Sequence, residues 1–133
     1  MNTFTLVLQD ATRAERLEAV SSFVGEDSSG SFGIRANHAR MMTVLVTGLA
    51  RFCIAADDWQ YLAMPGAVLY FCDNVLTLST RHYLRDEDYT RISAALQEQL
   101  LAEEEQLRST RESLRRMEES LLRRLWEMGR KGG

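Results

Sequence analysis

The chain is poor in cysteine and proline, with two cysteines and one proline in 133 residues. Two cysteines cannot build the disulfide framework of a small secreted protein. Cys53 and Cys72 each lie in an apolar run, so we expect buried, reduced thiols in a cytosolic protein. No apolar run approaches the roughly 20 residues that cross a bilayer, and the first residues lack the pattern of a signal peptide. The sequence therefore predicts a chain without a membrane-spanning segment.

Side chains suited to catalysis are also scarce. The two histidines, His38 and His82, lack the close pairing with each other or with cysteine that zinc sites show. Ser79, His82 and Asp86 have the residue types of a hydrolytic triad, but no G-x-S-x-G segment accompanies them. A phosphate-binding G-x-x-x-x-G-K-[ST] loop is missing too, and a net charge of −3 argues against a general nucleic-acid binder. We expect a non-enzymatic protein without metal or cofactor.

The first part of the chain, residues 1–84, has the short alternating apolar runs of β-strands. Turn signals separate these runs at Thr47-Gly48, Asp57-Asp58, Pro65-Gly66 and Asp73-Asn74. Residues 13–19 could form a short helix, but we interpret them as a loop leading into a strand over residues 17–24. Strands this short and closely spaced predict an antiparallel β-sandwich or flattened barrel.

The second part, residues 85–133, is predicted to be a helical arm, which makes the fold class α+β. Residues 86–128 contain neither glycine nor proline and are rich in leucine, glutamate and arginine. Leucine or methionine recurs every seven residues at Leu100, Leu107, Leu114, Leu121 and Met128. The positions four residues before these are Leu96, Glu103, Thr110, Met117 and Arg124, so the heptad seam is incomplete.

Charge divides the helical arm into two halves. Residues 86–106 carry seven acidic side chains and one arginine, whereas residues 107–131 carry eight basic and four acidic side chains. A hairpin with a bend at Ser109-Thr110 would place the acidic half against the basic half. The leucine spacing continues through this point without a slip, which favours one long helix.

The most distinctive segment is residues 30–39. Gly30 and Gly33 bracket Phe32, which predicts a sharp backbone turn beside a buried ring because glycine reaches positive φ at little cost. His38-Ala39 follows. In this setting the whole chain resembles the epsilon subunits of F-type ATP synthases, whose pattern here is G-x-F-G-[IV]-L-x-x-H-A.

Other segments carry the same resemblance in the same order. They are residues 5–11, 41–51, 59–66 and 73–78. Arg40 stands where the family usually has proline, and Pro65 replaces the family's second glycine near residue 65. Residues 78–81, which lead into the acidic residues 86–88, are more similar to the divergent, sodium-translocating branch.

The resemblance implies a non-catalytic rotor subunit that couples rotation of the gamma subunit and the c-ring to ATP synthesis or hydrolysis. It also implies a location at the cytoplasmic face of the bacterial inner membrane. One side of the sandwich would contact gamma, and the end that carries Gly30 to His38 would contact loops of the c-ring. The candidate contact residues are Gly30, Phe32, Gly33, His38, Met41 and Met42, with Trp59 as a further candidate. The two methionines and Trp59 could instead be core residues.

In this family the C-terminal helices can extend and oppose rotation against an acidic segment of the catalytic beta subunits. The resemblance therefore implies a possible inhibitory role for the arm. Its candidate contact residues are Arg115, Arg116, Arg123 and Arg124, whose guanidinium groups can bind carboxylates in a bidentate manner, together with Leu121 of the leucine series. The arginines could equally form an ordinary solvated face.

Some family members bind ATP through an [IL]-D-x-x-R-A pattern. Here only Asp88 and Arg91 of that pattern are kept, within residues 87–92. An aspartate and an arginine three residues apart on a helix more commonly form a local ion pair.

A second interpretation needs no ATP synthase. A stand-alone scaffold protein could combine a β-sandwich with dimerisation through the heptads of residues 92–128. A tight homodimer would favour this interpretation, whereas binding to a gamma-like protein would favour the rotor subunit.

Overall fold

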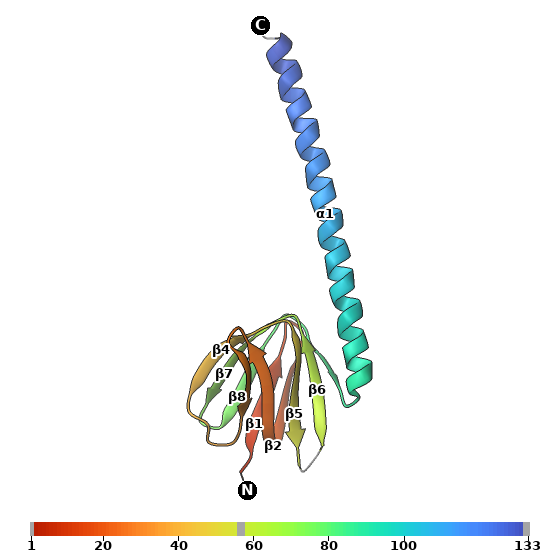
Figure 1. Ribbon diagram of the computed structural model, residues 1–133. Helices are drawn as coiled ribbons and strands as arrows, with labels where there is room; N and C mark the ends of the chain where they lie inside the picture. The colour runs from red at the N-terminus through yellow and green to blue at the C-terminus, as the bar shows by residue number, and fades with distance from the viewer. Residues whose placement is uncertain (1, 56–57, 132–133) are drawn as a thin grey trace. The chain divides into compact units, whose positions relative to one another are not determined.

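The computed structural model describes residues 2–55 and 58–131 (Figure 1). In chain order the elements are β1 (Phe4–Gln9), β2 (Ala14–Asp27), β3 (Gly30–Ile34), β4 (Met41–Leu45), β5 (Gly48–Ile54), β6 (Trp59–Met64), β7 (Ala67–Cys72), β8 (Val75–Ser79), β9 (Leu84–Asp86) and α1 (Tyr89–Lys131). Strands followed by a helix confirm the predicted fold class. The chain divides into two units, residues 1–96 and residues 97–133.

The strands of the described residues form one sheet that folds into two layers (Figure 1). One layer contains β1, β8, β7 and β4, and the other contains β5, β6 and β9. β2 belongs to both layers, because its first half pairs with β1 and its second half pairs with β3 and β5. The result is the predicted flattened barrel.

Strand directions agree with the antiparallel prediction, with one exception among the described strands. β1 and β8 run parallel, in a register that starts at Thr5↔Val75 and ends at Gln9↔Ser79. Neighbouring antiparallel strands can be joined by a tight turn, which fixes their direction. β1 and β8 are separated by six other strands in the chain, so no short connection imposes a direction on them.

Alternating apolar side chains fill the space between the layers. In β1, Phe4, Leu6 and Leu8 are 2% or less exposed, which confirms the alternation expected from the sequence. Rings and branched side chains from the other strands complete the core, including Phe23, Phe52, Leu62, Leu69, Phe71, Leu76 and Leu78. Burying one such side chain stabilises a fold by roughly 1.5–3 kcal/mol.

Two strands differ from the prediction. β2 already begins at Ala14, so residues 13–19 are largely strand rather than loop or helix. Pairing with β1, for example Leu6↔Leu17, outweighs the helix propensity of this glutamate-rich segment. Ala19, with a φ of 61°, lies close to register shifts in the pairings of β2 with both β1 and β5. β9, a short strand along β6, was not expected from the pattern because three residues show no period.

α1 is one continuous helix, which confirms the long-helix alternative over the hairpin. It begins after Asp88, whose backbone carbonyl accepts a hydrogen bond from the Ile92 amide at 3.1 Å. The Asp88 carboxylate also accepts the Arg91 amide at 3.2 Å, as a helix cap does. The suspected bend stays helical, and the Thr110 hydroxyl donates to the Gln106 carbonyl at 2.9 Å. At about 1.5 Å per residue the helix is roughly 65 Å long.

Candidate functional site: protein-interaction surfaces

The cysteines and the other metal-ligating side chains do not converge. Over residues 2–55 and 58–131, no three histidine, cysteine, aspartate or glutamate side chains are grouped to hold a metal ion. In the same part of the chain, no helix has the length and apolar character needed to span a bilayer. Cys53 is buried and its thiol donates to the Ala55 carbonyl at 2.8 Å. Cys72 is only half-buried, contrary to expectation, because it alternates with the inward-facing Phe71 in β7.

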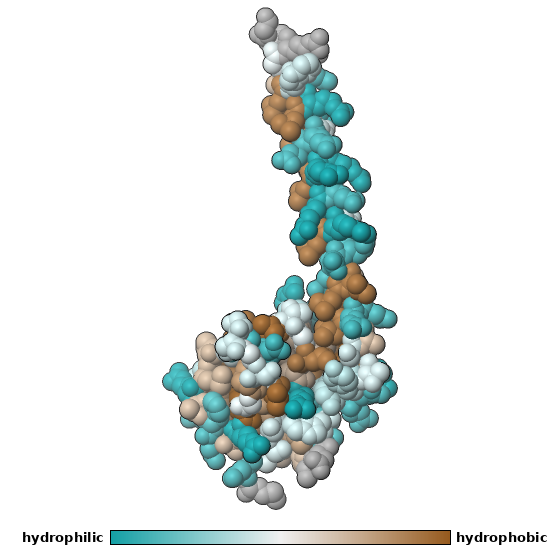
Figure 2. Space-filling view, in the orientation of Figure 1, coloured by the Kyte–Doolittle hydropathy of each residue, from teal (hydrophilic) through white to brown (hydrophobic). Residues whose placement is uncertain are grey.

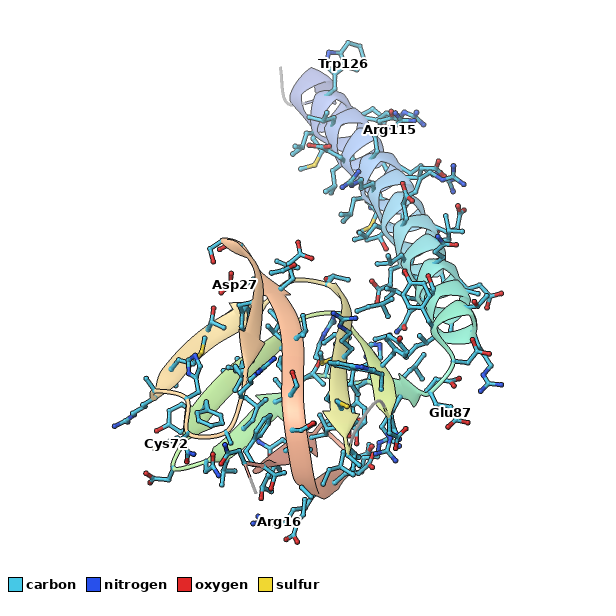
Figure 3. All side chains as sticks on the ribbon, turned by 60° about the horizontal axis from the view of Figure 1, so that its bottom comes forward. Arg16, Asp27, Cys72, Glu87, Arg115 and Trp126 are labelled. Carbon is cyan, nitrogen blue, oxygen red and sulfur yellow. The ribbon has the colours of Figure 1, made fainter. Side chains whose placement is uncertain are left out.

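One end of β3 is the turn that contains Gly30. Gly30 has a φ of 125°, in the region that glycine tolerates best. The Asp27 carboxylate, labelled in Figure 3, holds this turn by accepting hydrogen bonds from the amide and the hydroxyl of Ser29 and from the Thr43 hydroxyl. The Ser29 hydroxyl, followed by that of Thr43, holds the pKa of Asp27 below its ordinary value. The turn is therefore a pre-ordered, anionic tip.

The other end of β3 leads into the turn that contains His38. The Asn37 amide donates to the Asn74 side-chain oxygen at 2.8 Å, and the Asn74 amide group donates to the Thr3 carbonyl at 2.8 Å. The His38 ring packs edge-on against Phe71 at 5.9 Å between centroids. Asn74 thus ties this turn to the β7–β8 turn and to the start of the chain.

Gly30 is the first residue of β3 and His38 lies beyond the other end of that strand, so the structure does not bring them together in one loop. Phe32, between them, packs against the core as expected, although it is only partly buried. Gly33 is an ordinary strand residue outside the left-handed region, so it does not make the turn expected from the sequence. The glycine that the packing requires is Gly25, opposite Phe32 in β2, because a Cβ there would lie 2.9 Å from the Phe23 ring.

An exposed apolar surface lies on the outer face of β4 and β7. It consists of two cross-strand pairs, Met42↔Tyr70 and Val44↔Val68, and we call it the β4–β7 patch. Met42 is 68% exposed and Val44 is 64% exposed. Exposed side chains that adjoin in this way are typical of a surface that a partner covers.

The surroundings of the β4–β7 patch are more polar. The Arg40 guanidinium lies 5.7 Å from the centre of the Tyr70 ring. On β8, which pairs with β7, the Ser79 hydroxyl accepts a hydrogen bond from the side-chain amide of Gln9 at 2.7 Å. A shallow hollow of about 580 Å³ adjoins the patch at Val44 and Val68 and extends to Arg81. An apolar centre with a polar rim is the usual composition of a protein interface.

The other sequence candidates on the sandwich occupy different surroundings. Met41 alternates with Met42 and packs against the core, so only Met42 of the two belongs to the patch. Trp59 is half-buried on β6, and the Arg51 guanidinium lies 4.7 Å from its ring centre. Val44 and Val68 were missed as candidates, because valine in a strand is predicted to face the core unless the register is known.

The helix carries the second exposed apolar surface, which we call the heptad face. Its members Leu100, Leu107, Leu114, Met117, Leu121 and Met128 are between 41% and 68% exposed. Figure 2 shows such hydrophobic side chains between hydrophilic ones along α1. The predicted candidate Leu121 is thus part of an uncovered stripe.

The four candidate arginines of the arm do not share one side of the helix. At about 100° per residue, Arg116 and Arg123 lie on a common side, whereas Arg115 and Arg124 flank it. Arg116 lies 3.9 Å from Glu112, and the other three have no ion-pair partner among the described residues. Figure 3 shows Arg115 projecting from the helix.

The ATP-site candidates Asp88 and Arg91 are engaged locally. The Arg91 guanidinium donates to both carboxylate oxygens of Asp86, at 2.6 and 2.7 Å. The expected ion pair between Asp88 and Arg91 is therefore wrong. Arg91 pairs with Asp86, and Asp88 caps the N-terminus of α1. The Arg91 hydrogen bonds lower the pKa of Asp86 to about 2.

A cluster around Tyr83 was not expected from the sequence. The Tyr83 hydroxyl donates to the Glu15 carboxylate at 2.5 Å, and the Arg13 guanidinium lies 4.3 Å from the ring centre. Arg85 completes the cluster with an ion pair to Glu15 at 3.4 Å. Burial, and then the Glu15 hydrogen bond, raise the pKa of Tyr83 to about 12. The cluster fastens the start of β2 to the segment that precedes β9.

Comparison with known proteins relates the β-sandwich to a family. Residues 3–86 match the family model described as "ATP synthase, Delta/Epsilon chain, beta-sandwich domain". The chain is 32% identical over 88 residues to the ATP synthase epsilon chain 2 of Cereibacter sphaeroides, in a match that covers 65% of this chain and 60% of that protein.

Two solved structures share the fold. One chain of the Euglena gracilis mitochondrial ATP synthase (OSCP/F1/c-ring, rotational state 1) superposes with a TM-score of 0.59 at 17% identity, covering 72% of this chain and 62% of that chain. A chain of the Tetrahymena thermophila mitochondrial ATP synthase (central stalk/c-ring) superposes with a TM-score of 0.52 at 11% identity, covering 60% of this chain and 64% of that chain. The match thus spans less than two thirds of each relative's length.

Proposed function

This chain belongs to the ATP synthase Delta/Epsilon chain family, and from that premise we propose that it is a non-catalytic epsilon-type subunit of the central stalk of an F-type ATP synthase. The observation that carries the proposal is the family match over the whole β-sandwich, a domain whose outer face presents the β4–β7 patch. A stalk subunit transmits force through shape and contact area, which a packed sandwich with an exposed apolar face can do.

The β4–β7 patch is the proposed contact with the gamma subunit. Its apolar side chains stand on two paired strands whose inner faces belong to the core, so the surface is rigid before a partner binds. A preformed surface loses little conformational entropy on binding. A load on the patch would pass directly into the sheet.

The His38 turn is the proposed contact with the polar loops of the c-ring. Arg35, His38 and Arg40 are all exposed there, and Asn74 holds the backbone in place. The Gly30 turn, with its carboxylate, has the opposite charge. The proposal places this protein in the membrane-peripheral part of the complex, at the cytoplasmic face of the bacterial inner membrane.

The arm is the proposed regulatory part. Arg115, Arg123 and Arg124 have no ion-pair partner among the described residues, so they are available to acidic side chains of the catalytic beta subunits. Replacing these three and Arg116 by alanine would then raise ATP hydrolysis by the reconstituted complex. Unchanged hydrolysis would remove the inhibitory role and leave the stalk role intact.

The central proposal is tested by binding to the cognate gamma subunit. The wild-type chain should co-elute with purified gamma in size-exclusion chromatography. The double variant Met42→Asp/Val44→Asp should lose this binding, because two carboxylates in the buried centre of an interface would be desolvated without partners.

Leu84→Asp is the matched control for this experiment. Leu84 is 42% exposed on β9, outside the patch, so the same chemical change there should leave co-elution with gamma unchanged. Circular dichroism would establish that all three proteins are folded. Failure of the wild-type chain to bind gamma, or undiminished binding by the double variant, would overturn the proposal.

A further inference from the structure

The heptad face offers a second copy of this chain an exposed apolar stripe. Leucine and methionine recur every seven residues from Leu100 to Met128, and all are exposed. This spacing of 3.5 residues per turn is the spacing of a coiled coil. We propose that two copies pair through their arms, with the two helices antiparallel over residues 103–128. The pairing is proposed for the isolated chain, outside any assembled complex, and so it does not depend on the rotor role.

A parallel pair would place like charges in the seam. In a parallel coiled coil each seam residue lies beside the same residue of the second copy. Glu103 would then lie against Glu103 of the second copy, and Arg124 against Arg124. The acidic half of each arm would also lie along the acidic half of the other. Both effects oppose the parallel orientation.

An antiparallel pair removes these conflicts. If Leu114 lies opposite Met117 of the second copy, Leu121 lies opposite Thr110, Leu107 opposite Arg124, and Met128 opposite Glu103. Every layer from residue 103 to residue 128 then contains at least one leucine or methionine. Glu103 and Arg124 of the second copy fall in neighbouring layers, about 6 Å apart along the axis, within reach of their long side chains.

The positions beside the seam agree with this register. In an antiparallel coiled coil, the flanking position that follows one seam residue faces the equivalent position of the second copy. This register places Arg111 beside Glu118 of the second copy, and the two-fold symmetry makes this pair twice. Both side chains are exposed, and seven residues separate them on their own helix, so they do not compensate each other there.

The orientation is tested by cysteine cross-linking in the full-length chain. Ser113 is predicted to lie beside Ser120 of the second copy, so a mixture of S113C and S120C chains with different tags should form a disulfide-linked heterodimer under mild oxidation. Thr110→Cys alone should not link to itself, although a parallel pair would place the two residues together. Mass spectrometry of the linked peptides separates these products from any through Cys53 or Cys72.

The register is tested by charge exchange. In sedimentation equilibrium the wild-type chain should dimerise at micromolar concentration, and Arg111→Glu or Glu118→Arg alone should weaken the dimer about fivefold or more, because each creates like-charge pairs. The double variant R111E/E118R should restore wild-type affinity. A monomeric wild-type chain, a self-linking Thr110→Cys chain, or a double variant as weak as the single ones would overturn the proposal.

Discussion

The two units of the chain treat their apolar side chains in opposite ways. In residues 1–96 they alternate along strands, and side chains such as Phe71 and Leu76 are fully buried. In residues 97–133 they recur every seven residues, and Leu107 and Leu114 are each 58% exposed. A period of two can be satisfied between the layers of one sheet, whereas a stripe on a single helix needs a surface outside that helix. The apolar side chains of the sandwich are largely buried in its core, whereas those of the heptad face remain exposed.

Truncating one apolar side chain in each unit should give the largest difference in stability between variants. Phe71→Ala removes a fully buried ring from the core and should lower the free energy of unfolding by about 3–5 kcal/mol. Leu114→Ala removes a mostly exposed side chain, and should change the unfolding of the sandwich by less than about 0.5 kcal/mol. Chemical denaturation followed by near-ultraviolet circular dichroism measures both. Equal losses would mean that the heptad face belongs to the folding core.

A smaller effect tests how tightly the sandwich is packed. Gly25→Ala would place a methyl group 2.9 Å from the Phe23 ring and 3.3 Å from Leu45, so we expect a loss of about 1–3 kcal/mol. Gly33→Ala is the control in the neighbouring strand. Its methyl group would meet only a carbonyl oxygen at 3.7 Å, so stability should stay level or rise slightly. An unchanged free energy of unfolding in Gly25→Ala would show that the core around Phe23 can rearrange to accept the methyl group.

The smallest effect concerns the start of α1, within residues 1–96. The pKa of Asp86 is lowered from 3.8 to about 2 by Arg91, so the stabilisation is complete above pH 3.8 and is lost as the pH falls toward 2. The unfolding free energy should therefore decline across this range in the wild-type chain, and less steeply in Asp86→Asn.

Glu87→Gln is the matched control, since it removes a neighbouring carboxylate and leaves the Asp86–Arg91 pair in place. Its pH profile should follow that of the wild-type chain. An Asp86→Asn profile identical to the wild-type profile would place the acid sensitivity elsewhere.

Features with a local period could be predicted from the sequence. The alternation of Phe4, Leu6 and Leu8 and the uninterrupted leucine spacing beyond Tyr89 each specify one element, and both elements formed as expected. The first half of β2 could not be predicted, because its strand conformation depends on pairing with β1 rather than on its own composition. The Tyr83–Glu15 hydrogen bond could not be predicted either, because it joins residues 68 apart in the chain and depends on the tertiary fold.

The candidate site shows the same division. Met42 and Leu121 were identified from residue type and lie exposed, where a partner could reach them. The resemblance assigned Gly30 and His38 to one end of the sandwich, but Gly30 begins β3 and His38 lies beyond the other end of this strand. Val44 and Val68 entered the site only through the register of β4 against β7. The type of a residue predicts its chemistry, but which residues lie side by side can be predicted only when the pairing of the strands is known.

The passage of β2 through both layers has a mechanical consequence. A twist applied to one layer reaches the other along a covalent backbone, and sliding between the layers would require breaking the ladder that β2 makes with β1 or with β5. The shared strand thus opposes displacement of one layer against the other with backbone hydrogen bonds, in addition to the side-chain packing between the layers.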